Sequence, residues 1–177
     1  MSDAAAPAEP DAAPVPTPER RSLRPSLSVA LVIVVLDQLS KHWAVNRLSG
    51  DRNIDLFWRL RFHLTFNSGM AFSKGRGLGP IIGVVALIVV VGLLVSLRRD
   101  NSPLSTVAVG LVMGGAIGNV ADRLFRGDGW FRGSVVDFID PQWFPIFNVA
   151  DIAVNVGGAL LVLGSLFAGR RMSGATP

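Results

Sequence analysis

The chain has 177 residues, half of them apolar, and its mean hydropathy is +0.45. Soluble globular domains rarely have so apolar a composition, so we expect a single-domain membrane protein. The sequence has no cysteine and two histidines without an HExxH pattern, which excludes disulfides and argues against a metal site. Its formal net charge is +4, but the basic residues are scattered among apolar runs, so no nucleic-acid partner is expected.

The N-terminal segment, residues 1–25, is rich in alanine and proline and cannot bury a core. We therefore predict a disordered tail. Its start is acidic and lacks a basic region ahead of an apolar run, so it is not a signal peptide.

Four apolar segments each approach the length of about 20 residues that a bilayer-spanning helix needs. They cover residues 26–45, 79–97, 103–122 and 147–168. The sequence thus predicts an α-helical membrane protein, with one four-helix transmembrane domain over 26–168 and a short C-terminal tail over 169–177. Four spans place both termini on one side of the membrane.

Short basic flanks indicate which side that is. Arg98 and Arg99 between the second and third spans, and Arg170 and Arg171 after the fourth, lie on the same side as the N-terminal tail. Cytoplasmic flanks are enriched in such residues, so we predict cytoplasmic termini. The opposite loops carry more basic residues in total, but they also hold acids and show the patterns of folded structure.

Two patterns in those opposite loops predict a small β-sheet on the outer membrane surface. Apolar and polar residues alternate over 59–67, which indicates a strand with one apolar face. An Asp-Gly pair at 128–129 is a hairpin signal, and it is followed by a strand-like run at 134–139. Trp143 and Phe144, flanked by prolines, are typical of an interfacial anchor.

Polar residues in the spans are unexpected, because a charged group at mid-membrane costs roughly 2.5–3.5 kcal/mol. In three of the spans the polar residues recur at helical spacing, so the polar residues of each of these spans form a set on one helix face. Threading the chain up and down brings most of them to the outer ends of the spans, beside Asp137 in the last outer loop. Those that converge there are Asp37, Lys41, Asn119, Asp122, Arg123, Asn148 and Asp151. The sets are Asp37, Ser40 and Lys41; Asn119, Asp122 and Arg123; and Asn148, Asp151 and Asn155.

Each set also has a purely structural interpretation. Asp37 and Lys41 could be an i,i+4 ion pair, and the polar residues of the third span could form a structural network. Asn148 and Asp151 could cap the fourth helix, and Asp137 could be an ordinary exposed acid. The glycines of the third span indicate close helix packing.

Among possible chemistries, paired carboxylates fit best. A Ser-His pair such as Ser68 with His63 is conceivable but lies off the shared face. A Ser-Lys dyad through Lys41 would need a serine other than Ser40, which points about 100° away round the helix. No loop has the oxygen-ligand density that a hard cation needs. Two aspartates in a low-dielectric pocket keep one proton between them, as in aspartic proteases, and Asp137 and Asp151 are the natural pair.

At these residues the chain resembles lipoprotein signal peptidase (signal peptidase II), a family of membrane aspartic endopeptidases. Five motifs occur in order between residues 27 and 168, and together they are highly specific. They are Leu-Asp-Gln-x-Ser-Lys at 36–41, Asn-Ser-Gly-Met-Ala-Phe at 67–72, Gly-Ala-Ile-Gly-Asn-Val-Ala-Asp-Arg at 115–123, Val-Val-Asp-Phe at 135–138 and Phe-Asn-Val-Ala-Asp at 147–151.

The resemblance implies a bacterial cell-membrane enzyme that acts near the outer face on diacylglyceryl-modified prolipoproteins and cuts just before the modified cysteine. It implies Asp137 and Asp151 as the catalytic pair, membrane lipids as surroundings, no cofactor and no metal, and we expect a monomer. Other residues would bind substrate or support the site. They are Asn67, Gly69, Asn119, Asp122, Arg123, Asn148, Ala150, Asp37 and Lys41.

The stretch 124–136 is longer than the family's usual spacing, so loop contacts there cannot be carried over. Two other functions would also fit four spans with buried acids. One is a small proton-coupled transporter using Asp37, Asp122 and Asp151, which would spread acids through the membrane depth. The other is a non-catalytic membrane assembly protein with a structural polar cluster.

Overall fold

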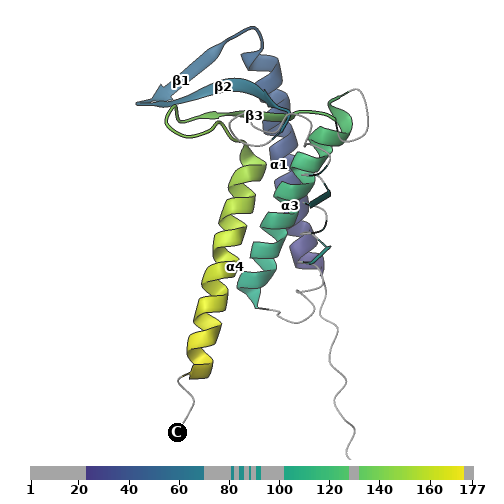
Figure 1. The fold of residues 1–177 in the computed structure, drawn as a ribbon, viewed down its shortest axis with the longest axis vertical. Coiled ribbons are helices and arrows are strands. Elements are labelled where there is room, and N and C mark those ends of the chain that lie inside the picture. Colours follow the sequence, from purple (N-terminus) through teal and green to yellow (C-terminus); the bar gives the residue numbers. More distant parts are fainter. Residues whose placement is uncertain are drawn as a thin grey trace, which may run out of the picture.

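The computed structural model describes residues 23–69, 102–127 and 132–173, together with six helical residues between 81 and 92. Three helices in this part of the chain are long and apolar enough to cross a membrane. They lie side by side, with a small sheet across one end (Figure 1). The helices are α1 (Arg24–Leu48), α3 (Pro103–Phe125) and α4 (Val149–Ser173).

The helices match three of the four predicted spans but differ at their ends. α1 begins at Arg24, inside the predicted tail, because Pro25 is well placed in a first helical turn, where no backbone N–H is needed. α4 begins at Val149 and continues to Ser173, so the predicted C-terminal tail is helical over part of its length. The predicted span 79–97 lies outside the described residues, apart from the six helical positions.

Small residues let α3 pack closely between α1 and α4. A Cβ on Gly114 would lie 2.6 Å from the Cβ of Ile33 in α1, and one on Gly115 would overlap the carbonyl oxygen of Ala150 in α4. The predicted packing role of these glycines is confirmed. This close approach sets the distance between the polar faces of the three helices.

The sheet is antiparallel, with strand order β1-β2-β3. Its strands are β1 (Asn53–Phe57), β2 (Leu60–Asn67) and β3 (Val135–Asp140). The two predicted strands are thus confirmed, whereas β1 was not predicted. β3 pairs with β2, with Asp137 opposite Thr65, and the hairpin joins β1 to β2. The Asp-Gly pair at 128–129 lies outside the described residues. The element directly before it is helix α3, which ends at Phe125, and a hairpin turn would need a strand there.

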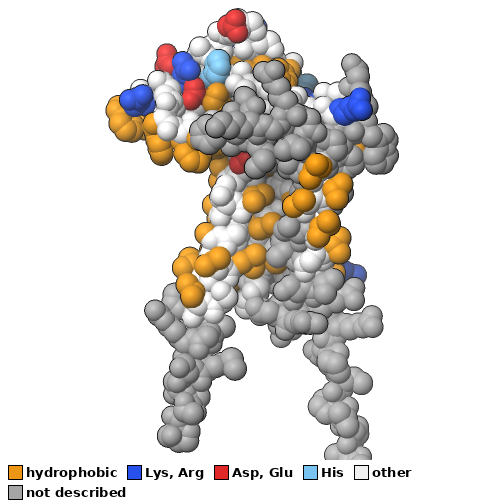
Figure 2. Space-filling view, in the orientation of Figure 1, with side chains coloured by type: hydrophobic (Ala, Val, Ile, Leu, Met, Phe, Trp, Pro, Cys, Tyr) orange, Lys and Arg blue, Asp and Glu red, His pale blue; other side chains and the backbone are white. Residues whose placement is uncertain are grey.

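The sheet is fixed to the end of α1 by apolar packing. Val136 and Phe138 of β3 are buried against Ala44 and Leu48 of α1. Phe62 of β2 adds an edge-on contact to Trp43, with ring centroids 5.1 Å apart. Figure 2 shows apolar side chains spread over the helices, whereas most of the visible charged side chains gather at the sheet end. The strand that carries Asp137 is therefore anchored to the helical bundle.

The helix packing can be tested with a matched pair of glycines. Gly115→Ala places a methyl group against the Ala150 carbonyl, and overpacking of this kind costs about 1–3 kcal/mol. The control Gly158→Ala lies in α4 with nothing within 4 Å of its new Cβ, and it should be neutral or stabilising by about 0.5–1 kcal/mol. Thermal unfolding in detergent should show a lower midpoint for the first variant alone. Equal midpoints would contradict the packing analysis.

Candidate active site

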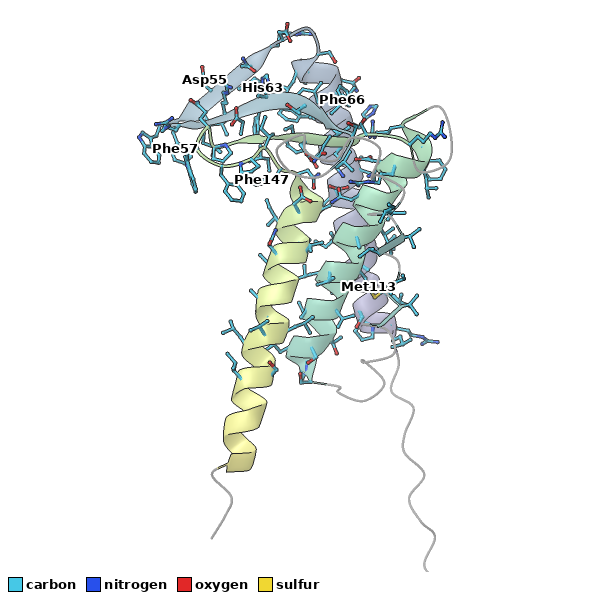
Figure 3. The ribbon with its side chains drawn as sticks, in the orientation of Figure 1. Asp55, Phe57, His63, Phe66, Met113 and Phe147 are labelled. Atoms are coloured by element: carbon cyan, nitrogen blue, oxygen red, sulfur yellow. The ribbon has the colours of Figure 1, made fainter. Side chains whose placement is uncertain are left out.

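The polar residues of α1, α3, β3 and the start of α4 meet where the helices reach the sheet. Figure 3 shows nitrogen and oxygen atoms gathered at this level, while Met113 lies further along the helices. Their predicted convergence is therefore confirmed. Within the described helices, the acids of the spans all belong to this one network, which does not fit the spread that a transporter would need. The buried members are Asp37, Lys41, Asp122, Arg123, Asp137 and Asn148.

Asp137 lies on the opposite face of β3 from its apolar neighbours, as strand alternation requires. Its Oδ2 accepts a hydrogen bond from Asn67 Nδ2 at 3.1 Å, and its Oδ1 accepts one from Asn148 Nδ2 at 2.6 Å. Burial, followed by the negative charge of Asp151, raises the pKa of Asp137 to about 6 despite these donors. Asp137 can therefore hold a proton at mildly acidic pH, unlike the exposed acid of the structural interpretation.

Asp151 lies in the first turn of α4 and forms a reciprocal cap with Asn148. The Asp151 N–H donates to Asn148 Oδ1 at 2.9 Å, and the Asn148 N–H donates to Asp151 Oδ2 at 3.2 Å. The capping interpretation is thus correct. It leaves Asp151 Oδ1 for a third contact, which is a hydrogen bond from Asn119 Nδ2 at 2.9 Å. The cap therefore holds the Asp151 carboxylate in place and does not exclude a chemical role for it.

Asn148 connects the two aspartates. Its side-chain carbonyl accepts from the Asp151 backbone, while its side-chain amide donates to Asp137 and, at 3.2 Å, to Asn119 Oδ1. Asn148 is fully buried. Its side-chain amide contacts the Asp137 carboxyl and its backbone N–H contacts the Asp151 carboxyl, so one residue relates the two carboxyl groups. Such a site can supply one acid and one base from the same side-chain type.

Asn67 connects the end of β2 to the site. Its Oδ1 accepts from the Gly69 N–H at 3.1 Å, which leaves its amide to donate to Asp137. The structure thus places Asn67 beside Asp137, and Gly69 supplies a backbone donor to Asn67. The remaining motif residues at 70–72 lie outside the described part of the chain.

Lys41 forms a buried ionic cluster beneath the dyad. Its ammonium lies 2.8 Å from Asp37 Oδ2 and 2.9 Å from Asp122 Oδ2, and all three side chains are shielded from solvent. The predicted i,i+4 pair is therefore correct but incomplete. Arg126 pairs with Asp122 Oδ1 at 2.7 Å. Sequence analysis missed Arg126, although its i,i+4 spacing from Asp122 was a usable signal.

The same two carboxylates also bind backbone. Asp37 Oδ1 accepts from the Ala150 N–H at 2.9 Å, and Asp122 Oδ2 accepts from the Val136 N–H at 3.1 Å. Ala150 is thus positioned at the start of α4 beside Asp151, and Val136 beside Asp137. The support residues therefore contact the chain next to each aspartate of the dyad.

Arg123 supplies a cation beside the dyad. It is buried, its Nη1 donates to the Asn119 carbonyl oxygen at 3.3 Å, and it interacts electrostatically with Asp137, Asp122 and Asp151. Its Nε is buried and has no hydrogen-bond partner within the described residues. A free buried donor next to two carboxyl groups is suited to binding a carbonyl oxygen. A search of the described residues finds no group of three histidine or acidic side chains that could hold a metal ion.

The sequence and the fold were then compared with known proteins. The profile of the family described as signal peptidase (SPase) II matches residues 29–167. A lipoprotein signal peptidase of Mycobacterium tuberculosis is 42% identical over 153 residues, which cover 86% of this chain and 75% of that protein. One from Streptomyces coelicolor is 40% identical, over 85% of this chain and 74% of the relative.

A solved structure has the same arrangement of elements. It is a bacterial membrane enzyme determined by the in meso method at 2.3 Å resolution, and its chain is 26% identical to this one. The superposition has a TM-score of 0.73 and covers 85% of this chain and 91% of the other.

The raised pKa of Asp137 predicts how stability changes with pH. The folded chain keeps this proton up to about pH 6, whereas an unfolded aspartate loses it near pH 3.9, so folding loses stability as pH rises between these values. Asp137→Asn lacks this titration. Its stability relative to the unsubstituted protein should therefore increase by about 2 kcal/mol between pH 4 and pH 7.5. Unfolding in denaturant at both pH values measures the difference, and a pH-independent difference would contradict the proton assignment.

Proposed function

The chain belongs to the signal peptidase II family, and on this basis we propose that Asp137 and Asp151 are its catalytic pair. The protein is a membrane aspartic endopeptidase that removes signal peptides from prolipoproteins. The observation that carries the catalytic assignment is that the buried Asn148 contacts both carboxyl groups: its side-chain amide donates to Asp137 Oδ1 and its backbone N–H donates to Asp151 Oδ2. Two aspartates so connected in a buried site can divide an acid role and a base role.

We assign the shared proton to Asp137 because its pKa of about 6 allows it to act as the acid. Asp151 then takes a proton from a water molecule, and the resulting hydroxide attacks the carbonyl carbon of the scissile peptide bond. Asp137 protonates the carbonyl oxygen, which gives a neutral tetrahedral diol. Acid–base steps of this kind contribute about 10²–10⁴-fold each.

The second half of the reaction returns the protons. Asp151, now protonated, gives its proton to the leaving amine, the C–N bond breaks, and Asp137 recovers its proton from the diol. The products are a carboxylic acid at the end of the signal peptide and an amine on the mature chain, and transfer of the acid's proton to the amine gives a carboxylate and an ammonium group. In this proposal the Nε of Arg123, which is buried and has no hydrogen-bond partner among the described residues, binds a substrate carbonyl oxygen. Asn67 and Asn119 position the carboxyl groups.

The proposed substrate is a prolipoprotein whose lipobox cysteine already carries a diacylglyceryl group, cut just before that cysteine. This is supported by the position of the site at the end of the apolar helices, where lipid chains could remain in the bilayer while the peptide reaches the dyad. Exposed aromatic side chains suit an interfacial anchor at this level, consistent with membrane lipids as partners. They are Phe57, Trp58, Trp143 and Phe144.

The proposed topology has four spans, with 79–97 as the second, both termini in the cytoplasm and the dyad near the outer face of a bacterial cell membrane. The protein would act as a monomer, because every proposed catalytic and supporting residue comes from one chain. No organic cofactor takes part in the proposed reaction. The structural support for this topology is that α1 leads into the sheet, and β3 leads into α4, at the same end of the helical bundle.

Removing either proposed catalytic carboxyl should abolish cleavage. Asp137→Asn and Asp151→Asn keep side-chain size but remove the acid or the base, so each should lose at least about 10²-fold in turnover. Mass spectrometry of a lipid-modified precursor measures the released signal peptide. Asp55→Asn, on the exposed strand β1, is a matched control that should cleave normally, and an unmodified precursor should be cut poorly. Near-normal turnover by either dyad variant would rule out the assignment.

The topology can be tested by thiol labelling because the chain has no native cysteine. Arg59→Cys lies in the exposed turn between β1 and β2, and Ser102→Cys lies at the opposite end of α3, just before its first turn. A membrane-impermeant maleimide should label position 59 in intact cells and position 102 only after the membrane is opened. The reverse result would invert the proposed orientation.

A further inference from the structure

The Lys41 ammonium has three hydrogens, and three buried oxygens accept from it. Two belong to Asp37 and Asp122, and the third is Asn119 Oδ1 at 2.9 Å. An ammonium can only donate, so it can face the oxygen of the Asn119 amide but never the nitrogen. Asn148 Nδ2 also donates to the same Asn119 oxygen, at 3.2 Å.

The Lys41 contact is the charged and shorter of the two that set how the Asn119 amide is oriented. With Oδ1 turned toward Lys41, the Nδ2 group must face the other way, where it donates to Asp151 Oδ1 at 2.9 Å. A flipped amide would place its nitrogen against the Lys41 ammonium and its oxygen against the Asp151 carboxylate, so two hydrogen bonds would be replaced by two repulsive contacts. Lys41 does not reach Asp151 itself.

We infer that Lys41 is a positioning residue for the catalytic pair: its buried ammonium fixes the Asn119 amide so that Asn119 always donates to Asp151. This inference rests on the proposed function of Asp137 and Asp151. It differs from a role in charge balance alone, in which Lys41 would neutralise Asp37 and Asp122 and have no effect through Asn119. The two roles can be separated, because only one of them requires Asn119.

The test removes the ammonium without leaving an unbalanced charge. Lys41→Met combined with Asp37→Asn deletes one positive and one negative charge, and the oxygen of the new asparagine can still accept from the Ala150 N–H. The same pair of changes is made in a chain that also carries Asn119→Ala. Single-turnover cleavage of a lipid-modified precursor with enzyme in excess gives a rate even for slow variants, and substrate titration separates kcat from KM.

The expected result is a strongly non-additive cycle. With Asn119 present, the double substitution should lower kcat about tenfold to hundredfold, the range for loss of a hydrogen bond to a charged group, and change KM less than about twofold. With Asn119→Ala, the same substitution should change kcat by less than about threefold. An equal loss in both backgrounds, or no loss when Asn119 is present, would overturn the inference.

Three further variants test the interpretation. Lys41→Arg keeps a donor-only cation and should keep kcat within about tenfold of the unsubstituted protein. If the double substitution prevents folding, the Lys41→Arg variant tests the inference instead. A folded Lys41→Arg protein that is as inactive as Asp137→Asn or Asp151→Asn would overturn it. Asp137→Asn and Asp151→Asn are assayed alongside. If they still cleave, the proposed function fails; if they do not and the cycle is additive, only the role of Lys41 fails.

Discussion

The buried ammonium of Lys41 between Asp37 and Asp122 is the interaction on which the site depends. Each of these carboxylates uses its other contacts to hold backbone, one at the start of α4 and one at the start of β3. These two backbone segments carry Asp151 and Asp137. Removing one partner of a buried ion pair costs about 3–5 kcal/mol, so the cluster stabilises the fold around both aspartates.

Close helix packing makes this cluster possible. A Cβ on Gly118 would lie 2.5 Å from Asp37 Oδ2, so a larger residue there would displace the carboxylate from Lys41. Glycine at this position lets the α3 backbone approach α1 while Gly115 does the same toward α4. The small residues of α3 therefore have an electrostatic consequence: they bring three charged helix faces into hydrogen-bonding range, where water is excluded and each contact is strong.

Much of this arrangement could be predicted from the sequence because it follows from local periodicity. Helical spacing placed Asp37 with Lys41 and Asn119 with Asp122, and alternation of residues identified β2 and β3. The short strand β1 was missed although Ile54 and Leu56 alternate with Asn53 and Asp55, which was a usable strand signal. The ends of α1 and α4 were also misjudged, since helices can continue beyond the apolar stretch that defines a span.

The hydrogen-bond partners inside the site could not be predicted, because they depend on how elements far apart in sequence meet. The sequence offered a cap or a catalytic role for Asp151 as alternatives, whereas the structure has the cap using only part of the carboxylate. The side-chain amides of Asn148 and Asn119 likewise donate and accept at once: Asn148 donates to Asp137 and Asn119 and accepts from the Asp151 N–H, and Asn119 donates to Asp151 and accepts from Lys41 and Asn148. Asparagine suits these positions because its two ends are chemically different at equal size. A carboxylate there could not donate, and an apolar residue could do neither, so two amides are the neutral means of holding two carboxyl groups apart in a buried site without adding charge.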